Sequence, residues 1–107
     1  MLEKTRGELR SKGTKYVSAV TIHELQKLTL EREGKEVASL RVGLVEKEFK
    51  VISLDGSLAK SSGVLRSKYG IPLADSVIGA TAMTLDLRCV TDDPHLKQIR
   101  EIKTRWI

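Results

Sequence analysis

The stretch IPLADSVIGATAMTL (residues 71–85), with CVTDDPHL (residues 89–96) shortly after it, determines how this sequence is interpreted. Pro72 is favourable at the start of a helix, and most of the residues that follow are small, so neighbouring backbones can approach them closely. The pattern predicts a helix in a crowded interior. A short strand and a turn come next, with Asp93 as the N-cap of a short last helix.

Strand and helix patterns alternate outward from this stretch. Strands are expected at 16–20, 49–52, 88–91 and 104–107, and helices at 2–12, 21–33, 35–47, 55–69, from 73 and from 94. Gly13, Gly34 and Gly70 each follow one of these helices as a C-cap. Such alternation is typical of an α/β domain whose mostly parallel sheet is covered by helices. No linker or repeat divides the chain, so residues 1–107 are expected to form a single domain.

Two of the expected helices carry more specific predictions. Thr21-Ile22-His23-Glu24 matches a capping box in which Thr21 is the N-cap and Glu24 is its partner. In the helix over residues 35–47, one face is expected to point into the core, and it consists of Val37, Leu40, Leu44 and Val45.

The composition is that of a basic globular protein. Lysine and arginine number 19 against 14 acidic residues, a net charge of +5. Positive charge favours polyanions such as nucleic acids, although a charge-rich surface without such a partner has the same balance. No apolar run is long enough to span a bilayer, and the first residues lack a signal-peptide pattern, so a cytoplasmic protein is expected. The single Cys89 agrees with a reducing compartment.

Three carboxylates are expected to meet at one edge of the sheet. Glu24 follows the strand that ends near Val20, and Asp93 follows the strand that ends near Thr91, so both lie beyond strand carboxyl ends. Asp75 is in the first turn of the small-residue helix and joins them if that helix starts at the same edge. Converging carboxylates need a cation, and oxygen ligands favour Mg²⁺ or Mn²⁺, which can activate water against a phosphodiester.

Each acid also has a structural interpretation. Glu24 completes the capping box, Asp75 complements the helix dipole, and Asp93 is an ordinary N-cap. His23 and His95 each lie next to a proposed ligand. We interpret both as surface or hydrogen-bonded residues, because neither has a cysteine or a second histidine nearby.

Four segments, taken in order, resemble the PIN-domain family, and in particular the toxin ribonucleases of VapBC-type toxin–antitoxin pairs. They are YVSAVTIHEL (16–25), FKVISLD (49–55), LRSKYGIPLADSVIGATA (65–82) and CVTDDPHL (89–96). The resemblance covers nearly the whole chain and implies a three-layer α/β/α fold.

The resemblance also implies a site and its partners. Glu24, Asp75 and Asp93 take the places of family acids that bind Mg²⁺ or Mn²⁺ and cleave RNA, with Thr91 as a supporting hydroxyl and Asp92 beside them. The implied partners are an RNA substrate, an antitoxin-like protein laid across the site and a second copy of the chain.

The sequence departs from the family at its start. Family members open with a strand that carries an Asp and lies at the centre of the sheet, whereas here no Asp occurs before Asp55. We therefore expect a truncated PIN-like domain that re-pairs its strands or associates with another chain. Either the missing strand is encoded upstream of Met1, or the gene product is shorter. Two functions follow: a metal-dependent PIN-type endoribonuclease, or a catalytically impaired PIN remnant that binds an antitoxin-like protein or its own copy.

Overall fold

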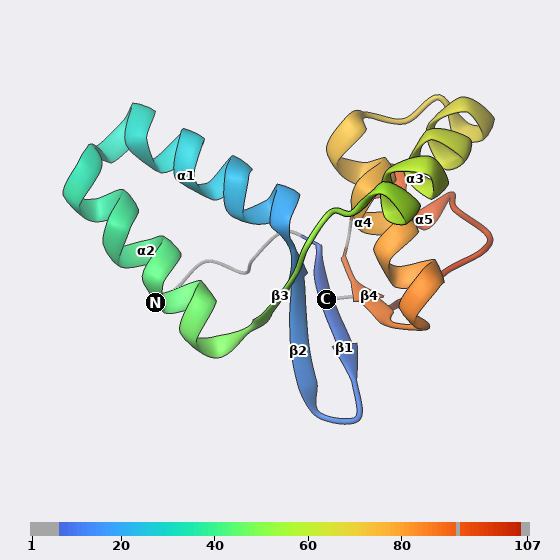
Figure 1. Cartoon of the computed structure of the whole chain (residues 1–107), viewed down its shortest axis with the longest axis horizontal. Helices are drawn as coiled ribbons and strands as arrows, with labels where there is room; N and C mark the ends of the chain where they lie inside the picture. The colour runs from blue at the N-terminus through green and yellow to red at the C-terminus, as the bar shows by residue number, and fades with distance from the viewer. Residues whose placement is uncertain (1–6, 92, 106–107) are drawn as a thin grey trace.

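A five-stranded sheet lies between two layers of helices (Figure 1). The computed structural model describes residues 7–91 and 93–105, apart from the side chain of Arg105. The strand order is β3-β2-β1-β4-β5. The strands are β1 (Glu8–Ser11), β2 (Thr14–Ser18), β3 (Lys50–Ile52), β4 (Arg88–Val90) and β5 (Lys103–Arg105).

The direction of the strands confirms the predicted sheet type. β2 and β3 pair in parallel, as do β4 and β5, whereas β1 is antiparallel to both of its neighbours, β2 and β4. All strands except β1 therefore run the same way, and the sheet is mostly parallel.

The helices cover both faces of this sheet. α1 (Ala19–Glu33) and α2 (Lys35–Glu48) form a helical hairpin on one side. α3 (Gly56–Tyr69), α4 (Leu73–Leu85) and α5 (Pro94–Lys97) lie on the other side (Figure 1). This arrangement confirms the three-layer α/β/α architecture. Among the helices in the described part of the chain, none is long and apolar enough to cross a bilayer.

The segment before β2 differs from the prediction. Residues 2–12 do not form one helix: Glu8–Ser11 are β1, and residues 2–6 lie outside the described residues. Lys12 and Gly13 have φ values of 49° and 83°, the backbone of a two-residue hairpin turn rather than of a helix end. Helix propensity is outweighed because β1 pairs with a strand on each side and buries Leu9 completely. β1 thus fills the centre of the sheet, between β2 and β4.

The start of α1 corrects the predicted capping box. The helix begins at Ala19, and its N-cap is Ser18, whose hydroxyl accepts a hydrogen bond of 3.2 Å from the backbone N–H of Val20. Thr21 is therefore inside the helix and is not its N-cap. Glu24 lies in the second turn, so the capping box does not explain its presence.

The inward face of α2 also differs from the prediction. Val45 is buried as expected, and Ala38 is the other buried position of this helix. Leu40 and Leu44, in contrast, are 69% and 41% exposed. The helix packs against α1 and β3 through a narrower stripe than the sequence pattern indicates, and two leucines remain on the surface.

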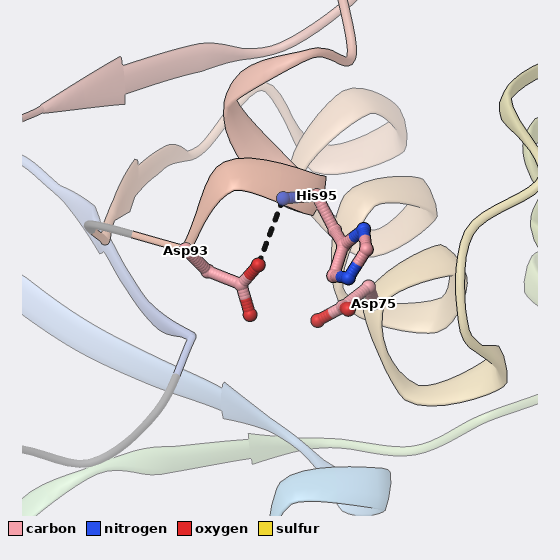
Figure 2. A group of neighbouring side chains, drawn as sticks. All are labelled: Asp75, Asp93 and His95. Carbon is pink, nitrogen blue, oxygen red and sulfur yellow. Dashed lines mark hydrogen bonds between the residues drawn. The ribbon is translucent and has the colours of Figure 1, made fainter.

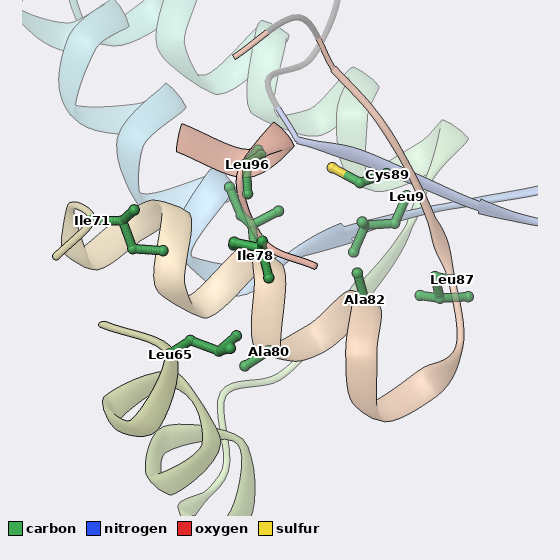
Figure 3. Packing of buried hydrophobic residues seen from close by; sticks show 10 residues of the cluster. Leu9, Leu65, Ile71, Ile78, Ala80, Ala82, Leu87, Cys89 and Leu96 are labelled. Carbon is green, nitrogen blue, oxygen red and sulfur yellow. The ribbon is translucent and has the colours of Figure 1, made fainter. Parts of the chain in front are cut away.

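The main core is built around α4 (Figure 3). Ile78 in this helix packs with Leu9 of β1, Cys89 of β4 and Leu65 of α3. A Cβ atom added to Gly79 would lie 2.7 Å from the Cδ1 atom of Ile99, so the missing side chain lets Ile99 pack closely against α4. The predicted role of the small residues, to let neighbouring segments come close, is confirmed. A second cluster, formed by Val17, Val45 and Phe49, fills the space on the α1–α2 side.

Candidate metal centre

A group of three potential metal ligands lies at the carboxyl edge of the parallel strands. Asp75 comes from the first turn of α4, Asp93 from the turn between β4 and α5, and His95 from α5. Their ligand atoms all lie within 4.8 Å of one another. Figure 2 shows the three side chains converging on a common point, with the imidazole ring close to the Asp75 carboxylate. The sequence left open where α4 starts, and in the structure it starts at the same edge as Asp93.

Asp75 is the most unusual member of the group because it is completely buried, with 0% of its surface exposed. An acid that serves only to complement a helix dipole acts from the surface and contributes about 0.3–1 kcal/mol. Burial of a carboxylate charge costs several kcal/mol when nothing offsets it. The helix dipole alone does not account for a carboxylate in this position.

Asp93 is held in place by hydrogen bonds on both sides. Its backbone N–H donates to the hydroxyl of Thr91 (2.9 Å), which is itself buried. One of its carboxylate oxygens accepts from the backbone N–H of His95 (2.8 Å) and caps α5. The second oxygen faces Asp75 (Figure 2). Asp93 is thus both an N-cap and a member of the cluster, and Thr91 orients it. Asp92 lies outside the described residues.

Glu24 is not part of this cluster. It is half-buried in α1, which begins where β2 ends and also contacts α4. Among the described residues, Glu24 belongs to no group of three metal-ligating side chains within 4.8 Å. Glu8 reaches the same edge of the sheet, because it pairs with Val90 at the end of β4. Its carboxylate forms an ion pair with the guanidinium of Arg10.

His95 is the member of the group that the sequence does not predict. Its position two residues after Asp93 was the only signal, and adjacency in sequence does not say where a side chain points. The turn at Pro94 brings the imidazole close to the Asp75 carboxylate (Figure 2). His95 of α5 therefore joins a site formed with Asp75 of α4 and Asp93 of the turn before α5, although the sequence places no other histidine nearby.

The three side chains fit a divalent cation. Mg²⁺ binds oxygen at about 2.1 Å, so two ligands on opposite sides of one ion are about 4.2 Å apart. The ligand atoms here all lie within 4.8 Å of one another, which is close enough for the three side chains to approach a single ion. Two carboxylates also supply the negative charge that such an ion requires.

Cys89 in β4 is close enough to the site to respond to its charge. Its side chain is fully buried in the main core. Burial raises the pKa of the Cys89 thiol to about 12, and the negative charges of Asp75 and Asp93 make smaller contributions in the same direction. The thiolate, which is the reactive form, is therefore scarce at ordinary pH.

We expect the native chain to resist modification of Cys89 by Ellman's reagent at mildly alkaline pH. The same thiol should react rapidly once the chain is unfolded in urea, because both burial and the neighbouring charges are then lost. The release of thionitrobenzoate measures both rates. Rapid labelling of the folded protein would contradict the position of Cys89 in the core.

Comparison with known proteins identifies the family. A model of the PIN domain matches residues 2–102, and the chain belongs to the PIN-domain family. No curated protein matches the sequence.

Three solved structures share the fold. VapBC2 from Rickettsia felis, bound to a DNA fragment from its promoter, has 19% identity and a TM-score of 0.73 over 85% of this chain and 73% of that one. A toxin–antitoxin complex from Klebsiella pneumoniae has 22% identity and a TM-score of 0.65 over 86% and 75%. DNA-bound VapBC from Salmonella typhimurium has 20% identity and a TM-score of 0.73 over 83% and 72%. At these identities the likeness establishes the fold.

Proposed function

We propose that this chain is a PIN-type endoribonuclease that depends on Mg²⁺ or Mn²⁺. The observation that carries the proposal is a fully buried Asp75 beside Asp93 at the carboxyl edge of the sheet, in a chain of the PIN family. Two carboxylates this close repel one another, and a cation between them removes the repulsion. The family and the donor set thus support the same chemistry.

The role proposed for each residue of the site follows from the helix, strand or turn that carries it. Asp75 and Asp93 hold the ion, and the Thr91 hydroxyl keeps Asp93 in position. Glu24 is the third proposed acid, and it contributes from α1. Mg²⁺ usually keeps several of its waters when a protein binds it. A carboxylate outside the immediate cluster can therefore interact with the ion by accepting a hydrogen bond from one of these waters.

The reaction proposed for this site is hydrolysis of an RNA phosphodiester. When bound, a divalent ion supplies a Lewis acid and lowers the pKa of a water molecule, which serves as the nucleophile. The residues of the chain provide the negative charge that holds the ion at the sheet edge. The net charge of +5 attracts the phosphate backbone. RNA is proposed as the substrate on the basis of the resemblance to VapC-type toxins.

We extend the proposal to the partners of the chain. The similar solved structures include complexes of toxins with antitoxins, and an antitoxin-like protein is proposed here as the inhibitor in a cytoplasmic toxin–antitoxin pair. An open groove of about 620 Å³ along the α1–α2 hairpin is available to such a partner. Its apolar lining includes Ile22, Leu30 and Val42.

A second candidate function is a protein-binding module without catalysis. The exposed Leu40 and Leu44 on α2 favour it, since such apolar positions on a helical hairpin are typical of interaction surfaces. In this alternative the chain binds an antitoxin-like protein or a second copy of itself.

Self-association is tested by light scattering. We expect the wild-type chain to scatter as a dimer and Leu40→Glu to shift it toward the monomer, because a charge in an apolar contact is costly. Val64→Glu is the matched control, since Val64 is 66% exposed on α3, away from the α1–α2 hairpin. A wild-type chain that is monomeric at all concentrations would contradict the proposed dimer.

The nuclease proposal is tested by incubating the chain with labelled single-stranded RNA and Mn²⁺, with an excess of chelator in a parallel sample. Cleavage in the first sample and none in the second is the expected result. If neither sample shows cleavage but the chain still binds an antitoxin-like protein or a second copy of itself, the result contradicts the nuclease proposal and supports the protein-binding alternative.

A further inference from the structure

The site contains an imidazole whose presence neither the fold nor the three proposed acids explain. The ligand atoms of Asp75, Asp93 and His95 are all within 4.8 Å of one another. His95 comes from a different element than Asp75, and its ring lies over the Asp75 carboxylate (Figure 2). The cluster is therefore a mixed nitrogen and oxygen donor set rather than a purely acidic one.

The local fold does not require the side chain of His95. Its backbone N–H donates to Asp93 and completes the cap of α5, and any residue other than proline provides that donor. The side chain is exposed, so it contributes little to the core. Neither the cap nor the packing of the core explains why this position carries an imidazole beside two carboxylates, one of them fully buried.

We propose that His95 is a nitrogen ligand of the metal ion and that it shifts the preference of the site from Mg²⁺ toward Mn²⁺ and later first-row ions. Imidazole binds transition ions well and Mg²⁺ poorly, whereas carboxylates serve both. One nitrogen donor added to two carboxylates therefore favours the transition ion. This inference rests on the proposed function only in that the cluster binds a metal.

A different role for His95 has the opposite consequence. As a protonated imidazolium that only pairs with the carboxylates, it would compete with the cation for the same negative charge. Its removal would then tighten metal binding rather than weaken it. The sign of the effect of a His95 substitution thus separates the two roles.

The experiment compares Mn²⁺ binding by the wild-type chain, His95→Gln and His23→Gln, without RNA. Affinity is measured from the electron paramagnetic resonance signal of free Mn²⁺, with Mg²⁺ added in competition. Pulsed measurements on bound Mn²⁺ detect the nuclear modulation of a coordinated nitrogen. His23→Gln is the matched control, because His23 is an exposed histidine of α1 that lies outside the cluster.

The expected result is a loss of Mn²⁺ affinity of about tenfold or more in His95→Gln, with a much smaller loss for Mg²⁺. The nitrogen modulation should disappear in this variant and persist in His23→Gln. Unchanged or tighter Mn²⁺ binding in His95→Gln, or a wild-type spectrum without nitrogen modulation, would overturn the assignment and leave a carboxylate site intact.

A wild-type chain that binds no Mn²⁺ would overturn both the assignment and the metal dependence of the proposed nuclease. Nitrogen-coordinated Mn²⁺ without RNA cleavage would support the assignment and count against the nuclease alone.

Discussion

Asp75→Asn is expected to lower the rate of metal-dependent RNA cleavage by about a hundredfold or more, because metal catalysis contributes several kcal/mol to the reaction. The substitution hardly changes the shape of this fully buried side chain, so the packing of α4 is kept while the negative charge is lost. The immediate cluster is then left with one carboxylate and one imidazole, so the site holds a divalent ion less tightly. The measurement is the initial rate on single-stranded RNA with excess Mn²⁺.

Thermal unfolding gives a second measurement of the same change. Mn²⁺ at about a hundred times its dissociation constant should stabilise the wild-type chain by about 2.7 kcal/mol, and the variant much less. Asp86→Asn is the control: it is the same chemical change at the other end of α4, where the aspartate side chain is 88% exposed. Asp86 has a φ of 52°, which asparagine also adopts readily. Cleavage by Asp75→Asn at the wild-type rate would remove Asp75 from the mechanism.

Leu9→Ala is expected to destabilise the fold by about 2–5 kcal/mol, a large part of the stability of a domain of this size. Leu9 is completely buried at the centre of the sheet, opposite Tyr16 of β2 and Cys89 of β4, and it packs against Ile78. Truncation leaves a cavity where the sheet meets α4. Urea unfolding followed by circular dichroism measures the loss.

The matched control is Leu73→Ala, the same change at a position that is 57% exposed. Its effect should stay within about 0.5 kcal/mol. A small effect of Leu9→Ala, similar to that of Leu73→Ala, would mean that Leu9 faces solvent. The segment would then be a surface helix, as its composition predicts, and β1 would not lie at the centre of the sheet.

The elements after β1 were largely predictable because their signals are local. Asp55 accepts a hydrogen bond from the backbone of Leu58 at the start of α3, and Gly70 ends the helix in the left-handed region. Gly34 separates α1 from α2 in a similar way. Each of these interactions joins residues a few positions apart, so the residue types alone indicate where a helix begins or ends.

The candidate site was predictable in part. Asp75 and Asp93 meet as expected, because α4 and the turn after β4 start from the same edge of the sheet. The sequence does not predict His95 as a ligand, because an isolated histidine is usually a surface residue and no local signal shows that Pro94 turns it toward Asp75. Glu24 remains a proposed participant.

Local sequence patterns correctly predict the boundaries of α3, the break between α1 and α2 at Gly34, the mostly parallel α/β class and the burial of the small-residue helix. They also predict that Asp75 and Asp93 lie close together, as they do in the structure. Three features become visible only in the folded chain: Glu8–Ser11 form a central strand, Leu40 and Leu44 lie on the surface, and His95 joins the carboxylates. The physical reason is the range of the interactions. Caps and turns depend on neighbours along the chain, whereas strand pairing, burial and the convergence of side chains depend on residues that only the folded chain brings together.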